Sequence, residues 1–95
     1  MNAPLPPPVR AIKLVEQATT FGRDQVLIAL GEKRLMVSKR QAEKLVGNNY
    51  LKTWEDNRLI HGYKKGTGIN AKIEYNRLDL QKLQLSETYH YFMND

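Results

Sequence analysis

The chain has 95 residues, a formal net charge of +5 and no cysteine. This length predicts one domain with a small hydrophobic core, and the lack of cysteine excludes a disulfide framework and a thiolate metal site. No apolar run approaches the roughly 18 residues that a membrane span needs. The first residues also lack the charged and apolar regions of a secretory signal, so we expect a cytoplasmic protein without a membrane partner.

The charge is unevenly distributed along the chain. The segment Lys33–Lys82 holds 12 Lys and Arg residues against 5 Asp and Glu, whereas the rest of the chain holds 3 against 5. Such an excess of positive charge is typical of a surface that binds a polyanion. An ordinary solvated basic face is the alternative, and charge alone does not separate the two.

The N-terminal part predicts a tail followed by a helical extension. Residues 1–8 contain all four prolines, which fix φ and lack an amide donor, so we expect a disordered proline-rich tail. From Val9, apolar residues recur at three-residue steps, and a second apolar cluster follows Thr19–Gly22. This predicts a helical extension over residues 9–31, as two helices or one bent helix with Gly31 as a left-handed cap. The extension could pack on the core or on a second subunit.

A short helix is predicted over Lys39–Val46, after a brief strand at Leu35–Val37. Ser38 stands at the N-cap position and Gln41 at the third helical position, which together form a capping box. Gly47 is a typical residue to end this helix.

A second short helix is predicted over about Tyr50–Asp56. An Asn of the tight turn at residues 47–49 is expected to cap it, and Asn57 is expected to end it in the left-handed conformation. Leu51, Trp54 and Arg58 define its inner side. Two short helices joined by a glycine-containing turn predict a helix-turn-helix. The residues that point outward or flank this face are Asn49, Tyr50, Lys52, Thr53, Asp56 and Asn57.

A β-hairpin and a third helix are predicted next. Leu59–Tyr63 and Ala71–Tyr75 have the composition of strands, and the glycine-rich basic stretch Lys64–Asn70 is expected to be the loop between them. Asn76 then caps a helix that has Asp79 at its third position. Residues 86–95 are expected to form an aromatic-rich tail that packs on the domain or on a partner.

The predicted fold is mainly α with a small β-hairpin wing, and its order of parts resembles the MerR-like and excisionase-like winged helix-turn-helix domains. The turn after Gly47 is about two residues shorter than in those domains, and Arg58 stands where they usually have glycine. The resemblance implies a winged helix-turn-helix over residues 32–85 that binds duplex DNA without a cofactor, in a bacterial regulator or architectural protein of a mobile element or phage. The residues that carry the resemblance are Ala42, Trp54–Asn57, Leu59, Ile60, Lys64, Lys65, Tyr75, Asp79 and Leu80.

Two groups of residues are candidates for contacting DNA. Asn, Lys and Thr on an outward helix face suit base edges in the major groove, and basic residues at a helix start and on a flexible wing suit phosphates. A polar surface is the alternative explanation for both groups. The recognition-helix candidates are Asn49, Tyr50, Lys52, Thr53 and Asn57. The first-helix and wing candidates are Lys39, Arg40, Lys64, Lys65, Thr67 and Lys72.

A second hypothesis is a protein-interaction adaptor that uses residues 9–31 and the aromatic tail, which could equally serve a homodimer. Single-stranded RNA binding is a weaker third hypothesis, because only Tyr50 and Tyr63 offer outward rings for stacking. His61 and His90 lack the spacing of metal ligands. No nucleophile, base or metal set assembles in the sequence, so we expect no metal and no enzymatic activity, and a cytoplasmic protein associated with the nucleoid.

Overall fold

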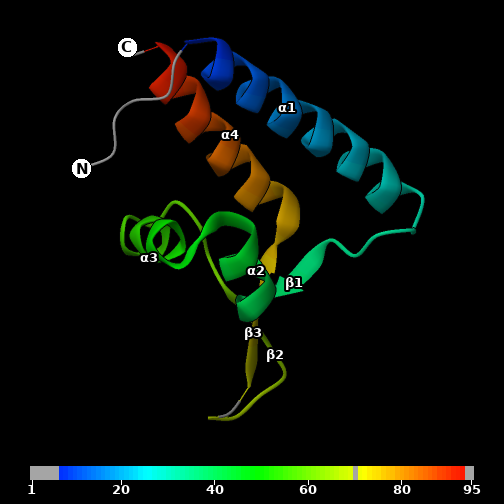
Figure 1. Cartoon of the computed structure of the whole chain (residues 1–95). Coiled ribbons are helices and arrows are strands. Elements are labelled where there is room, and N and C mark those ends of the chain that lie inside the picture. The colour runs from blue at the N-terminus through cyan, green and yellow to red at the C-terminus, as the bar shows by residue number, and fades with distance from the viewer. Residues whose placement is uncertain (1–6, 70, 94–95) are drawn as a thin grey trace.

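The computed structural model describes residues 7–69 and 71–93, which form four helices and a three-stranded antiparallel sheet (Figure 1). The prediction of a mainly helical fold with a small β part is confirmed at this level. The elements in chain order are α1 (Pro7–Ala29), β1 (Met36–Ser38), α2 (Lys39–Val46), α3 (Asn48–Asp56), β2 (Tyr63–Lys65), β3 (Lys72–Asn76) and α4 (Arg77–Met93).

Helix α1 is one continuous helix through Thr19–Gly22, so of the two predicted alternatives the division into two helices is wrong. Thr and Gly in a helix interior cost only about 1 kcal/mol or less each relative to Ala, and packing along α4 offsets this cost. The helix also starts two residues earlier than predicted, at Pro7. Proline fits the first helical turn because the amides there have no intrahelical acceptor. The predicted disorder of residues 1–6 concerns residues that lie outside the described part of the chain.

The C-terminal end of α1 has the predicted left-handed glycine. Gly31 has φ of 77°, its amide donates to the carbonyl of Ile28 at 3.0 Å, and the amide of Glu32 donates to the carbonyl of Leu27 at 2.8 Å. These two bonds form a Schellman motif, which satisfies carbonyls that the helix itself leaves free.

Helix α2 has the predicted bounds and the predicted capping box. The Ser38 hydroxyl accepts from the Gln41 amide at 3.2 Å, and the Gln41 side chain accepts from the Ser38 amide at 3.1 Å. Gly47, with φ of 91°, ends α2 and also stands at the N-cap of α3. The turn is therefore a single residue, and the predicted capping by an Asn side chain is wrong because Asn48 and Asn49 already lie in the helix.

Helix α3 ends at Asp56 as predicted and begins two residues earlier than predicted, at Asn48, but its left-handed closing residue comes one position later. Asn57 has φ of −89°, and the left-handed residue is Arg58, with φ of 59°. The Arg58 amide donates to the Glu55 carbonyl at 3.1 Å, and the Leu59 amide donates to the Trp54 carbonyl at 2.8 Å, which is again the Schellman pattern. Arg58 is exposed, so its predicted place on the inner side is wrong: it follows the helix and no longer shares its periodicity.

The sheet has the order β1-β3-β2, with both neighbouring pairs antiparallel. The predicted strand at Leu59–Tyr63 is wrong, because β2 begins only at Tyr63. The left-handed turn at Arg58 directs Ile60 into the core before the chain becomes extended. Gly62 then passes close to β3: a Cβ at Gly62 would lie 2.6 Å from the Ile73 side chain, so a larger residue does not fit there.

Helix α4 begins at the predicted cap, where the Asn76 side chain accepts from the Asp79 amide at 3.0 Å. It continues to Met93, so the separate tail predicted for residues 86–95 is wrong; residues 94–95 lie outside the described part. No Gly or Pro follows Leu85 to stop the helix, and its C-terminal half runs beside the N-terminal half of α1 (Figure 1).

The core lies between α2, α3, α4 and the sheet, and Trp54 is buried in it at 2% exposure, as predicted. Ile73 is not part of this core, because it lies farther out along β3 and is 37% exposed. Tyr75 on the same strand is in the core and has no exposed surface. The core residues are Val37, Ala42, Val46, Leu51, Trp54, Ile60, Tyr75 and Leu80, with Leu45 and Leu83 packed against them.

Candidate nucleic-acid interface

Helix α3 presents a polar face to solvent because its other face is fixed in the core. Leu51 and Trp54 are buried, whereas Asn49, Lys52 and Thr53 are exposed. The helical repeat of 100° per residue places these three on the side opposite the buried pair. The predicted outward orientation of these candidates is therefore confirmed, and Asp56 is exposed as well.

The two flanking residues of α3 have different surroundings. Tyr50 is half exposed, and its ring lies against that of Trp54 with the centroids 5.6 Å apart. This contact restricts the Tyr50 ring, because the indole beneath it is held in the core. Asn57 is exposed at the C-cap of α3. Tyr50 therefore flanks the exposed face near the N-terminal end of α3, and Asn57 flanks it at the C-terminal end.

The first turn of α2 carries the cations predicted for the first helix. Lys39 and Arg40 occupy its first two positions and are exposed. Cations are unfavourable beside the positive end of a helix dipole. The capping box described above stabilises this helix start in spite of them.

The β2–β3 hairpin is basic, and its register separates the three wing lysines. Lys65 lies directly opposite Lys72, and Lys64 lies directly opposite Ile73. Opposite residues of an antiparallel pair point to the same face and successive residues point to opposite faces. Lys65 and Lys72 therefore share one face, while Lys64 shares the other face with Ile73 and the buried Tyr75. The prediction placed Lys64 and Lys65 together in a loop, which is wrong because both lie in β2.

The hairpin tip consists of small residues in unusual backbone conformations. Gly66 and Gly68 have φ of 99° and 117°, a region that is accessible to glycine at little cost. Thr67 between them is exposed, as is Ile69. The tip therefore presents a hydroxyl and an apolar side chain beyond the last paired residues, Lys65 and Lys72.

The candidate cations differ in their partners from Lys33 and Arg77, two other basic residues of the chain. Lys33 donates to Asp24 at 2.9 Å, and Arg77 donates to the carbonyl of Arg34 at 3.1 Å. Within residues 7–69 and 71–93, no ion pair to an acidic side chain joins the following cations: Lys39, Arg40, Lys52, Lys64, Lys65 and Lys72.

A buried polar cluster, which the sequence analysis missed, joins α1 to α4. Asp24 is 1% exposed and accepts from Lys33 Nζ at 2.9 Å and from Gln81 Nε2 at 2.8 Å. Burial acts to raise the pKa of Asp24, but the hydrogen bonds from Lys33 and Gln81 and the charges of Lys33 and Arg23 outweigh it and lower that pKa. Asp24 lies three residues after Phe21 and four before Ile28, and this helical spacing is the signal that could have revealed its burial.

Tyr75 of β3 is a further buried side chain that carries a polar atom, its hydroxyl. Burial raises its pKa to about 12, and the negative charges of Glu55 and Glu43 act in the same direction. Its hydroxyl therefore stays protonated at physiological pH. This ring supports the sheet and does not supply a charge to the surface.

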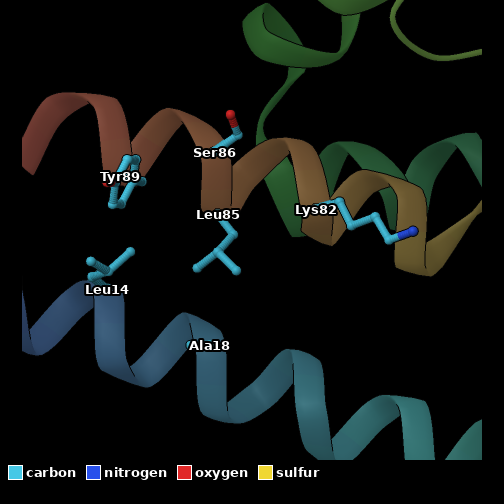
Figure 2. A pocket seen from close by; sticks show the side chains of 6 residues that line it. All are labelled: Leu14, Ala18, Lys82, Leu85, Ser86 and Tyr89. Atoms are coloured by element: carbon cyan, nitrogen blue, oxygen red, sulfur yellow. The ribbon is translucent and has the colours of Figure 1, made fainter.

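A shallow apolar groove separates the middle parts of α1 and α4. Figure 2 shows Leu14 of α1 and Leu85 of α4 pointing toward each other across it. Apolar atoms form nearly all of its surface, so it offers apolar contact and no catalytic chemistry. Its lining residues are Leu14, Ala18, Lys82, Leu85, Ser86 and Tyr89.

Comparison of the chain with protein-family models, with curated protein sequences and with solved structures gave no significant match. Among residues 7–69 and 71–93, no helix combines the length and the apolar character needed to cross a bilayer. In the same residues, His, Asp and Glu side chains do not gather into groups of three that could hold a metal ion.

Proposed function

We propose that the chain is a non-catalytic duplex DNA-binding protein in which α2, α3 and the β2–β3 hairpin act as a winged helix-turn-helix of the MerR-like or excisionase-like kind. The observation that carries the proposal is the exposed polar face of α3, opposite a buried Leu51 and Trp54 and one residue after α2. The major groove of B-DNA admits an α-helix, and a helix anchored on one side can present the other side to it.

The exposed face of α3 has side chains suited to base edges. The amide of Asn49 can bond an adenine at two atoms, Lys52 can donate to guanine or to a phosphate, and Thr53 offers a hydroxyl and a methyl group. All three are exposed and lie on one side of the helix. Tyr50 and Asn57 at the flanks then complete the proposed recognition surface.

The β2–β3 hairpin, which is the proposed wing, has a repulsion between two lysines that a polyanion would relieve. Lys65 and Lys72 stand directly opposite each other on one face of the hairpin, and like charges in this arrangement destabilise a sheet. A phosphate placed between or beside them would turn this repulsion into attraction. We propose that this face and Thr67 at the tip contact the DNA backbone, with Lys64 contacting it from the other face. Lys39 and Arg40 at the start of α2 would hold a neighbouring phosphate.

By this proposal the protein acts by binding alone, as a transcriptional regulator or architectural component on the bacterial nucleoid. The second candidate function is a protein-interaction adaptor. The apolar groove between α1 and α4 favours it, because such a groove can accept an apolar side chain of another protein.

The experiment compares variants of the two proposed contact surfaces on two kinds of DNA: a duplex selected from a random pool and a random duplex. Thr53→Ala and Asn49→Ala should weaken binding to the selected duplex more than binding to the random duplex, by about 1–3 kcal/mol for each good base contact. The double variant Lys65→Ala, Lys72→Ala should weaken binding to both duplexes alike. It should also reduce the slope of log affinity against log salt by about one unit per lost phosphate contact.

Lys13→Ala is the matched control, because Lys13 is an exposed lysine of α1 outside both surfaces. It should leave both affinities unchanged. Unchanged binding by the double lysine variant would refute the wing assignment. A pool without any preferred sequence would refute base reading by α3 and leave the architectural role.

A further inference from the structure

Helix α1 has a second apolar stripe on the side away from α4. Ile12, Val15 and Val26 are 58%, 63% and 58% exposed, and Leu30 just after the helix is 66% exposed. The side toward α4 is a different one, formed by residues such as Leu14 and the buried Asp24. A helix that packs on only one neighbour normally carries polar residues on its outer side. The fold of one chain therefore does not explain this stripe, and Figure 1 shows α1 at the edge of the molecule.

The stripe has the spacing of a coiled-coil seam. Within the helix, the line from Ile12 to Ala29 alternates steps of three and four residues, which is the a/d pattern of a heptad repeat, and Leu30 lies beside this line. The two central positions, Thr19 and Gly22, have small side chains or none. A Cβ placed at Gly22 would have no other atom within 4 Å, so space beside the helix is open there. The seam residues are Ile12, Val15, Thr19, Gly22, Val26 and Ala29.

We propose that this seam pairs with the same seam of a second copy of the chain, with the two α1 helices antiparallel. In that arrangement the seam is self-complementary, because position a of one helix packs in a layer with position d of the other. Val15 pairs with Val26 of the second copy, and Thr19 pairs with Gly22 of the second copy. Ile12 and Ala29 pair in the same way at both ends. A twofold axis between Thr19 and Gly22 makes every contact occur twice.

The flanking charges favour the second copy as the partner, and the antiparallel direction in particular. Glu16 and Arg23 occupy equivalent positions beside the seam, and antiparallel pairing brings Glu16 of each copy to Arg23 of the other. Arg23 is available, because its side chain is 61% exposed although its Nε lies 3.5 Å from Asp24. Parallel pairing would bring these two residues opposite Ala11 and Ala18 and form no ion pair. Antiparallel pairing also joins the exposed Val9 to Leu30 of the second copy.

Sedimentation of the full chain over two decades of protein concentration tests the proposal. The parent should sediment as a dimer at high concentration, and Val15→Glu should weaken dimerisation by roughly tenfold or more, because it places a carboxylate in the apolar seam of both copies. Lys13→Glu is the matched control: it changes charge on an exposed residue of the same helix outside the seam. It should leave the dimer intact. This test does not depend on DNA, so its failure leaves the proposed function standing.

Cysteine cross-linking tests the direction, because the chain has no cysteine of its own. A mixture of Ile12→Cys and Ala29→Cys chains should form a mixed disulfide, because a disulfide requires Cα atoms within about 7 Å. Each variant alone should form no disulfide under oxidation, since antiparallel pairing separates Ile12 of one copy from Ile12 of the other by about 25 Å at 1.5 Å per residue.

Self-cross-linking of Ile12→Cys alone would overturn the antiparallel pairing in favour of a parallel one. A parent that sediments as a monomer throughout and a mixture that forms no disulfide would overturn the interface. Cross-linking needs no disruptive substitution, so it decides the question even if Val15→Glu fails to fold.

Discussion

Arg58 ends α3 in a conformation that its side chain disfavours. It has φ of 59°, and it is the only non-glycine residue with positive φ in the described part of the chain. The left-handed helical region costs a residue with a Cβ roughly 1–2 kcal/mol.

Replacing Arg58 by glycine should therefore stabilise the protein. We expect Arg58→Gly to raise the free energy of unfolding by about 0.5–1 kcal/mol, because relief of the strained φ outweighs the greater freedom of glycine in the unfolded chain. Urea unfolding of the full chain measures this change. Asn57→Gly is the control: Asn57 has φ of −89°, so the same glycine should destabilise there. A loss of stability in both variants would contradict this account of the turn.

Among the elements, α1 and α4 are joined by a cluster of hydrogen bonds around one buried charge. Asp24 accepts hydrogen bonds from Lys33 and Gln81, and these bonds and the nearby cations lower its pKa below the ordinary 3.8 despite burial. The unfolded chain then binds more protons in acid than the folded chain does. Asp24 therefore stabilises the fold above its ordinary pKa, and this contribution is lost as the pH falls through the lowered value.

Asp24→Asn should lower the free energy of unfolding at neutral pH by about 1–3 kcal/mol, because Lys33 would lose its charged acceptor. The difference between parent and variant should shrink as the pH falls below about 4. Urea unfolding at a series of pH values measures both effects. Asp56→Asn, at an exposed aspartate of α3, should change stability little at any pH. A parent–variant difference that is constant from neutral to acid pH would show that the charge of Asp24 plays no part.

The elements also differ in how far the sequence predicted them. Helix α2 was predicted with correct bounds because its signals are local: the Ser38 cap, Gln41 and Gly47 all lie within one short segment. Helix α4 was predicted too short, and the sequence did not decide whether α1 is one helix or two, because the two helices stabilise each other and that contact joins distant parts of the chain. Strand β2 was misplaced because a left-handed arginine is not a turn signal that composition reveals.

The same distinction holds for the candidate interface. Helical periodicity predicted that Asn49, Lys52 and Thr53 are exposed, because it depends only on spacing along α3. The separation of Lys64 from Lys65, and the pairing of Lys65 with Lys72, depend on strand register. This register depends on where the chain turns between the two strands and on the packing of Tyr75 in the core, so the sequence pattern alone did not predict it.

As a whole, the molecule has two layers with different surfaces. Helices α1 and α4 form a layer joined by the Asp24 cluster, with an apolar groove and an apolar outer stripe. The second part, formed by α2, α3 and the sheet, carries the unpaired candidate cations and the polar face of α3. This division is consistent with the two proposals: association between chains through α1, and DNA binding through α3 and the wing.

The most direct test of the central proposal is the affinity of the full chain for random duplex DNA, measured by fluorescence anisotropy at several salt concentrations. Four or five phosphate contacts predict a plot of log affinity against log salt with a slope of about −4, because each contact releases nearly one counterion. Binding should therefore be clear at low salt and weaken steeply as salt rises. No binding at low salt, or binding that does not depend on salt, would contradict the proposal and favour the adaptor function.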